Sequence, residues 1–156
     1  MASPPTAPAR TPEVEQQSTG ARTLSAAQPG QTRGDSDLFT AGKDALTARD
    51  YSRVIASLRE FLDRAPQDPR APEARFLLAE SYRADGRFAD AVRAYTEFLE
   101  RSPEDLRVPA ATFGLAESRI ALKDSAGCSA LREALARYPA APEAASATTI
   151  LSTRCP

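Results

Sequence analysis

Apolar residues recur at helical spacing along most of the chain. In the best-defined stretch they follow the pattern i, i+3, i+4, i+7, which predicts one buried face of a helix over about 88–101. The residues of this face are Phe88, Ala91, Val92, Tyr95, Phe98 and Leu99. A preceding helix is predicted over about 72–84, because Pro72 and Glu73 suit a first turn and Asp85-Gly86 suits a stop. Two helices joined by a short turn therefore form the basic unit.

This unit recurs with a shift of 37 residues. The run Leu78-Ala79-Glu80-Ser81 returns as Leu115-Ala116-Glu117-Ser118, and Phe39, Phe76 and Phe113 keep the same spacing. The same plan predicts helices over 36–48, 51–64, 109–122 and 126–137, followed by a last helix from 142 to about 153. Self-similarity at such a period is typical of stacked helical repeats, in which each pair buries its apolar face against its neighbours. We therefore expect an all-α solenoid.

Small residues stand at one position of each predicted helix, where paired helices would approach closely. In the first helices of the three units these are Gly42, Ala79 and Ala116. In the second helices they are Val54, Ala91 and Cys128. Larger side chains are expected to fill the space between pairs, namely Leu58, Phe61, Tyr82, Tyr95 and Phe98.

The first 34 residues differ from the rest in composition. They contain five Pro, six Ala and eight Ser or Thr, with few large aliphatic side chains. Such a segment buries too little apolar surface to offset the entropy of ordering it, so 1–34 is predicted to be a disordered linker. The repeat domain is then 35–156, with units at about 35–67, 71–104 and 108–140 and a capping helix at 142–154.

The charge pattern argues against several classes of partner. The net charge is −1, with 20 basic and 21 acidic residues spread along the chain and no block of Lys or Arg. We therefore expect no binding to nucleic acid or to an anionic membrane. No apolar run is long enough to cross a bilayer. No signal peptide is visible, so the chain is expected either to be cytoplasmic or to be a trimmed piece of an exported protein, and its start inside a linker favours the second.

Chemistry-bearing motifs are scarce. The chain contains no His and no Trp, so the commonest general base and metal ligand is missing. No glycine-rich phosphate loop, paired-cysteine zinc pattern or nucleophile elbow is present. We therefore expect no catalytic residues, no metal and no cofactor, and a role in binding.

The central unit resembles the tetratricopeptide repeat. The residues that carry the resemblance are Tyr82, Gly86, Phe88, Ala91, Tyr95 and Pro103. The outer units match more loosely, since Arg49 and Lys123 replace Gly86 and Ser125 replaces Phe88. The resemblance implies three helix pairs and a capping helix.

In this family the first helix of each pair lines a concave groove. The resemblance places eight residues there: Phe39, Lys43, Phe76, Glu80, Arg83, Phe113, Glu117 and Ile120. One interpretation is a peptide-binding groove with an aromatic floor and walls of mixed charge. The other is that the three Phe pack between repeats and belong to the core. The sequence leaves both open.

A narrower resemblance rests on longer phrases. Ala-Arg-Asp-Tyr (48–51), Phe-Leu-Asp-Arg-Ala-Pro (61–66), Pro-Glu-Ala-Arg-Phe-Leu-Leu-Ala-Glu-Ser-Tyr (72–82) and Ala-Leu-Ala-Arg-Tyr-Pro (134–139) resemble the C-terminal domain of the Tol-Pal system tetratricopeptide-repeat family. These are cell-division coordinators of the Gram-negative periplasm. The resemblance covers about 35–156, and it corresponds to the repeats and final helix of that family.

The Tol-Pal resemblance implies a non-enzymatic periplasmic scaffold. Its partners would be the TolA protein and the cell-wall synthesis machinery, and it would link outer-membrane constriction to septal peptidoglycan synthesis. A full-length protein would trimerise through a coiled coil that is not in this chain. Two alternatives remain: a component of outer-membrane protein assembly, which has similar units, or a cytoplasmic peptide-binding adaptor.

The two cysteines flank the last predicted turn. Cys128 lies near the start of one helix and Cys155 just past the end of the next, and the midpoint between them falls in the turn at 139–142. Two antiparallel helices hinged there would bring the thiols together, so a disulfide is predicted, as suits an oxidising compartment. The alternative is that Cys128 is only the small residue at a helix crossing and Cys155 is free.

Overall fold

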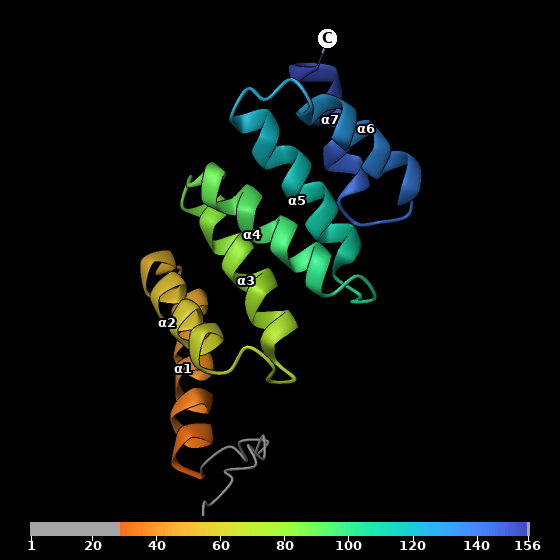
Figure 1. The fold of residues 1–156 in the computed structure, drawn as a ribbon. Helices are drawn as coiled ribbons and strands as arrows, with labels where there is room; N and C mark the ends of the chain where they lie inside the picture. The colour runs from red at the N-terminus through yellow and green to blue at the C-terminus, as the bar shows by residue number, and fades with distance from the viewer. Residues whose placement is uncertain (1–28, 156) are drawn as a thin grey trace, which may run out of the picture.

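The computed structural model describes residues 29–155 of the protein, with side chains from residue 34 on. This part of the chain forms seven α-helices (Figure 1). Their bounds are α1 Pro29–Thr47, α2 Tyr51–Arg64, α3 Ala71–Ala84, α4 Phe88–Arg101, α5 Val108–Ala121, α6 Gly127–Arg137 and α7 Ala144–Arg154. The first helix begins at residue 29 and not at 36 as expected. The linker prediction for residues up to 28 lies outside the described part.

The helices form three antiparallel pairs, α1–α2, α3–α4 and α5–α6, followed by α7. Each helix packs mainly on the helix before it and the helix after it, and α3 also contacts α5. Figure 1 shows the pairs stacked in chain order from α1 to α7. The predicted all-α solenoid is confirmed. Between residues 29 and 155 no helix is long and apolar enough to cross a membrane.

Aspartate side chains stabilise the starts of three helices. The Asp50 carboxylate accepts a hydrogen bond from the Arg53 backbone N–H (3.1 Å) and so caps α2. In the turn before α3, the carboxylate of Asp68 accepts from both the backbone and the guanidinium of Arg70 (2.8–2.9 Å). Asp105 and Arg107 repeat this arrangement before α5. The second and third pairs of helices are therefore entered through the same Asp–Arg turn.

A left-handed residue closes the turn inside each pair. Arg49, Gly86 and Lys123 have φ values of 56°, 76° and 59°. Only glycine adopts this conformation without steric cost, so the two outer units carry strain that the central unit avoids.

The core lies within and between the pairs. Leu58, Phe61, Tyr95, Phe98 and Leu131 are fully buried, and all five come from the second helices. The small residues of the first helices let these side chains approach. A Cβ added at Gly42, for example, would lie 2.6 Å from Cδ2 of Leu58. Burial therefore depends on neighbouring helices, as expected of stacked repeats.

The small crossing residue of α6 is Gly127, not Cys128 as the strict 37-residue register predicts. A Cβ at Gly127 would lie 2.7 Å from the backbone N of Ile120 on α5, so only glycine fits there. Gly127 is buried, whereas Cys128 is only half-buried. A tight turn takes the place of the first helical turn here: the Gly127 N–H donates to the backbone carbonyl of Asp124 and the Ala126 N–H to its carboxylate, both at 2.9 Å, whereas the Ala91 N–H donates to the carbonyl of Arg87 four residues before it. The third unit is thus one residue shorter, and Gly127 and Leu131 correspond to Ala91 and Tyr95.

Candidate functional site

Five of the eight predicted groove residues line one cavity between α3 and α5. Phe76, Glu80 and Arg83 come from α3, and Phe113 and Glu117 come from α5. The cavity has a volume of about 110 Å³ and is completed by Ala110, Gly114 and Glu143. We call it the inner cavity.

A second hollow of about 240 Å³ adjoins the inner cavity, since Arg83 and Glu117 line both. Its other walls are mostly apolar and come from α4, α5 and α7. They are Phe88, Ile120, Ala121, Ile150 and Arg154. The sixth predicted residue, Ile120, is therefore in this adjoining hollow. Together the two hollows combine a charged wall with an apolar one.

Arg83 organises the charges of the inner cavity. Its Nη2 pairs with Oε2 of Glu80 at 2.7 Å, and its Nη1 pairs with Oε2 of Glu117 at 3.4 Å. Its Nε donates to the hydroxyl of Tyr95 at 3.1 Å, and that hydroxyl in turn donates to Glu80. The guanidinium thus joins α3, α4 and α5. Burial alone would lower the pKa of Arg83, but its bonds to Glu80 and Tyr95 raise the pKa overall, so the side chain stays charged.

Tyr95 reaches this network because α5 has no side chain in its path. A Cβ at Gly114 would lie 2.5 Å from both Cζ and Oη of Tyr95. The ring is fully buried, and burial together with the negative charge of Glu80 raises the pKa of its hydroxyl. Tyr95 therefore acts as a neutral hydrogen-bonding group at any physiological pH.

The negative charge of Glu117 is only partly balanced by the positive charge near it. Burial raises its pKa; the charge of Arg83 opposes this, and the charges of Glu80 and Glu143 add to it. The inner cavity holds these three carboxylates against one guanidinium. A positively charged group entering the cavity would therefore be favoured by charge.

The three Phe do not form an exposed row. Phe39 and Phe113 are buried, at 7% and 0% exposure, and only Phe76 is half-buried. The ring of Phe39 packs at a tilt of 51° against Phe61, with centroids 5.3 Å apart, and that of Phe76 packs at 57° against Phe98, at 5.6 Å. The interpretation as core residues therefore holds for Phe39 and Phe113, whereas Phe76 packs on its own helix pair and still borders the cavity.

The two groove residues of the first unit lie apart from the cavity. Phe39 is covered by the guanidinium of Arg70, 5.2 Å from the ring centroid. Lys43 is exposed, and its Nζ pairs with Oε1 of Glu73 at 3.0 Å. Whether either residue contacts a partner stays a prediction.

Seven lining residues of the two hollows were not predicted as groove residues: Phe88, Ala110, Ala121, Gly114, Glu143, Ile150 and Arg154. The last three belong to α7 or to the residue before it, because α7 packs back beside α5. The only available signal for Gly114 was a glycine inside a predicted helix, which usually marks a close approach.

A disulfide between Cys128 and Cys155 holds α7 to α6. The Cα atoms are 5.8 Å apart. The Nη2 of Arg132 donates to the backbone carbonyl of Cys155 at 3.2 Å, which adds a second tie. The pair predicted from the sequence is thus the pair found, and it fixes the helix that closes the adjoining hollow. Among the described residues no cluster of His, Cys, Asp or Glu could hold a metal ion.

Stacked antiparallel pairs with a small residue at each crossing define a helical-repeat protein that presents faces instead of a deep pocket. The sequence matches the tetratricopeptide-repeat family over residues 39–105 and 78–127, which together span more than half of the chain. The protein belongs to this family, whose fold is generally a non-enzymatic scaffold for binding other proteins. No curated protein sequence matches the chain significantly.

Proposed function

We propose that this domain docks a protein partner at the inner cavity and the hollow beside it. The observation that carries the proposal is the convergence of Phe76, Glu80, Arg83, Phe113 and Glu117 on one cavity. These residues come from two different repeat units, so the site exists only in the assembled stack. The fold's general role in protein interaction supports this use of the face.

The chemistry of the two hollows suggests what the partner segment presents. Three carboxylates line the inner cavity against the single guanidinium of Arg83, which favours a basic side chain. The adjoining apolar wall of Phe88, Ile120 and Ile150 favours an aliphatic or aromatic side chain nearby. The volumes suit single side chains and not a whole folded element. An amphipathic segment with one basic anchor fits both hollows.

For the cellular role, we propose a scaffold of the Gram-negative periplasm. The Tol-Pal resemblance suggests TolA as the partner, with a role in linking outer-membrane constriction to septal peptidoglycan synthesis and contacts to cell-wall synthesis machinery. The Cys128–Cys155 disulfide supports an oxidising compartment. Trimerisation of a longer protein through a coiled coil belongs to the same proposal.

Two other functions make different predictions. A component of outer-membrane protein assembly would bind unfolded β-barrel precursors in preference to TolA. A cytoplasmic peptide-binding adaptor would keep Cys128 and Cys155 reduced in the cell. The disulfide favours the first of these over the second.

Calorimetric titration with the purified periplasmic part of TolA tests the proposal. We expect saturable binding that weakens about tenfold or more in Glu80→Gln/Glu117→Gln, because these variants remove charge from the buried wall of the site. The matched control is Glu100→Gln/Glu104→Gln, which removes the same charge at two exposed positions away from the cavity. Absence of binding by the folded domain would contradict TolA as the partner. Equal weakening in both variants would contradict the site.

A further inference from the structure

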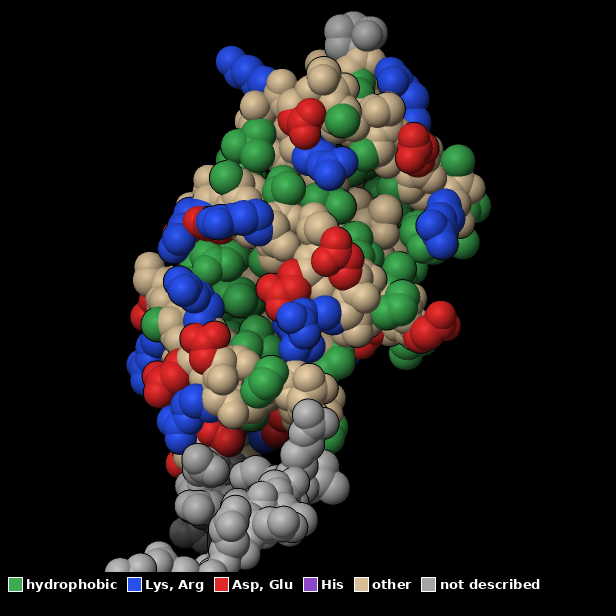
Figure 2. All heavy atoms as spheres, viewed as in Figure 1, with side chains coloured by type: hydrophobic (Ala, Val, Ile, Leu, Met, Phe, Trp, Pro, Cys, Tyr) green, Lys and Arg blue, Asp and Glu red, His purple; other side chains and the backbone are tan. Residues whose placement is uncertain are grey.

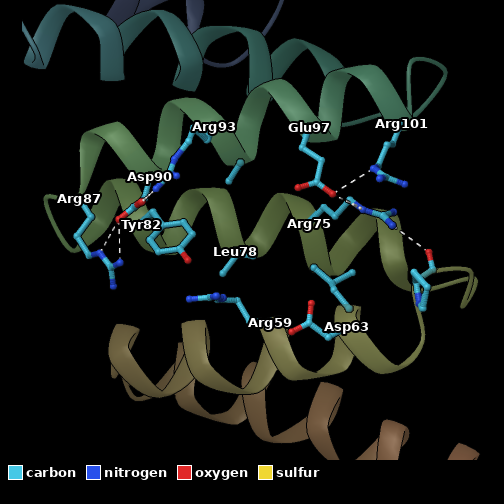
Figure 3. A pocket seen from close by; sticks show the side chains of 13 residues that line it. Arg59, Asp63, Arg75, Leu78, Tyr82, Arg87, Asp90, Arg93, Glu97 and Arg101 are labelled. Atoms are coloured by element: carbon cyan, nitrogen blue, oxygen red, sulfur yellow. Dashed lines mark hydrogen bonds and ion pairs between the residues drawn. The ribbon is translucent and has the colours of Figure 1, made fainter.

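A larger cleft lies between α2 and α4, on another face of the stack. Its volume is about 700 Å³ (Figure 3). The lining residues come from α2, the following turn, α3 and the full length of α4. On α3 it uses Arg75, Leu78 and Tyr82, which lie about a third of a turn around the helix from Phe76, Glu80 and Arg83. We call it the outer cleft, and it is distinct from the inner cavity.

The outer cleft is rich in arginine. Five guanidinium groups line it, from Arg59, Arg75, Arg87, Arg93 and Arg101. Only three carboxylates accompany them, from Asp63, Asp90 and Glu97, so the cleft has an excess of two positive charges in a chain of net charge −1. Figure 2 shows basic and acidic side chains side by side over α2 to α4, with apolar side chains between them.

The carboxylates in the cleft balance only part of the positive charge of its guanidinium groups. Asp90 pairs with both Arg87 (2.8 Å) and Arg93, and Glu97 pairs with both Arg75 (3.6 Å) and Arg101 (3.1 Å). Asp90 and Glu97 are thus each shared between two guanidinium groups, whereas Asp63 pairs with none of the described residues. Among residues 34–155 Arg59 has no ion-pair partner, and Figure 3 shows it on α2 facing α3 across the cleft.

Arg75 forms part of the floor. Its side chain is only 9% exposed, and its Nη2 donates to the backbone carbonyl of Pro66 at 2.9 Å. Burial and the charge of Arg101 lower the pKa of Arg75, although the guanidinium stays protonated at physiological pH. A buried positive charge in this position gains from any further carboxylate brought into the cleft.

The next junction of the stack shows that packing does not require these arginines. The residues that correspond to Arg59, Arg75 and Arg93 between the second and third units are Thr96, Thr112 and Ser129. The framework around them is retained, since Leu62, Pro66 and Leu78 correspond to Leu99, Pro103 and Leu115. These three arginines are therefore additions to one junction, whereas Arg101 keeps its type in Arg64 and Arg137 of the neighbouring units.

We propose that the outer cleft binds an acidic segment of a protein partner. Planar guanidinium groups bind carboxylates through two parallel hydrogen bonds, and the apolar floor of Leu62, Leu78 and Ala94 accepts a neighbouring aliphatic side chain. The interleaved Asp63, Asp90 and Glu97 disfavour a continuous phosphate backbone. The recessed position between two helices disfavours a flat lipid surface. This surface is independent of the inner cavity.

Fluorescence anisotropy tests the proposal. The probe is a fluorescein-labelled peptide of about twelve residues with the repeat Glu-Glu-Leu, compared with its Gln-Gln-Leu counterpart at about 50 mM salt. We expect the acidic peptide to bind at least tenfold more tightly than its counterpart, about the strength of a charge-assisted contact.

The variant Arg59→Thr/Arg93→Ser copies the next junction at two exposed positions and leaves buried Arg75 in place. We expect it to weaken binding of the acidic peptide about tenfold. The control Arg53→Thr/Arg137→Ser removes the same charge outside the cleft and should change the affinity less than about twofold. Thermal unfolding of both variants checks that they fold.

Three results would overturn the proposal. The first is no preference for the acidic peptide over the glutamine peptide. The second is equal weakening in the cleft variant and its control. The third is tighter binding to a labelled single-stranded DNA or to phosphatidylglycerol vesicles, lost in the cleft variant, which would assign the arginines to phosphate groups.

Discussion

The two junctions between repeat units place their charged hollows on different faces. At the second junction Arg83, Tyr95 and Gly114 open the inner cavity, and the positions that correspond to them at the first junction hold Leu46, Leu58 and Leu77. On the outer side the relation is reversed, because Arg59, Arg75 and Arg93 give way to Thr96, Thr112 and Ser129. The same backbone plan therefore presents two different surfaces.

This difference separates packing positions from lining positions. Residues that hold the pairs together keep their type between units, as Phe61 and Phe98 or Ala79 and Ala116 do, and they are buried. Residues that line a hollow change type without changing the fold. Function in a repeat protein is therefore best sought where equivalent positions differ and the packing around them does not.

The largest effect is expected from removing the disulfide. Cys128→Ser/Cys155→Ser should lower the free energy of unfolding by about 3.5 kcal/mol, because the closed loop no longer restricts the unfolded chain. Urea unfolding measures this change in the free energy of unfolding. Hydrogen exchange should show faster exchange in α7 and in the α5 residues that line the second junction, with little change in α2. Uniform acceleration along the chain would contradict this division between the junctions.

The next largest effect is expected from replacing Gly114 at the second junction by leucine, the residue found at the equivalent position 77 of the first junction. Gly114→Leu should cost about 2–3 kcal/mol, because its side chain would overlap the ring of Tyr95. The double variant Tyr95→Leu/Gly114→Leu has the residues of the first junction, Leu58 and Leu77, at both positions. It should recover most of the lost stability, and its side chains should fill the inner cavity. Thermal unfolding of the two single variants and the double variant measures the coupling. Additive losses would show that the two positions do not share one space.

A third, smaller effect should be equal at both junctions. Asp68→Asn and Asp105→Asn should each cost about 1 kcal/mol at neutral pH, because each removes the ion pair with Arg70 or Arg107. The bonds from Arg70 lower the pKa of Asp68. Burial would raise the pKa of Asp105, but the bonds from Arg107 lower it overall.

The sign of the pH dependence follows from these lowered pKa values. The stabilisation is present above the unfolded-state pKa of about 3.9 and is lost as the pH falls through the folded-state pKa. Unfolding measured between about pH 5 and pH 2 should therefore show a shallower loss of stability in either variant than in the parent protein. A steeper loss in the variants would contradict the assignment.

The smallest effect concerns the turns inside the pairs. Arg49→Gly and Lys123→Gly should each stabilise the protein by about 0.5–1 kcal/mol, since glycine adopts the left-handed conformation without strain. Gly86→Ala should destabilise it by a similar amount. Midpoints of thermal unfolding measure all three. A loss of stability in Arg49→Gly would mean that the arginine makes contacts that outweigh its strain.

The sequence predicted the helices well because the local signals agreed with the repeat. The bounds of α2 and α4 match, and α3 and α5 differ by a single residue at their ends. The predicted core of Leu58, Phe61, Tyr95 and Phe98 is confirmed by its burial. The predicted register of α6 was wrong by one residue, because a fixed period does not reveal the tight turn from Asp124 to Gly127.

The site was predicted only in part. Glu80, Arg83 and Glu117 were placed in one groove by the resemblance to the tetratricopeptide repeat, and they do converge. Burial of Phe39 and Phe113 depends on how neighbouring pairs close over them, which periodicity within one helix does not give. The outer cleft was missed because its arginines are scattered over three helices, so no basic block appears in the sequence.

The most direct test of docking at the second junction follows the amide chemical shifts of the domain by NMR as the periplasmic part of TolA is added. We expect the largest shift changes at Glu80, Arg83, Gly114 and Glu117, with small changes at Arg59 and Arg93 in the outer cleft. Changes confined to the outer cleft would contradict docking at the inner cavity, and no changes with TolA in excess would contradict TolA as the partner.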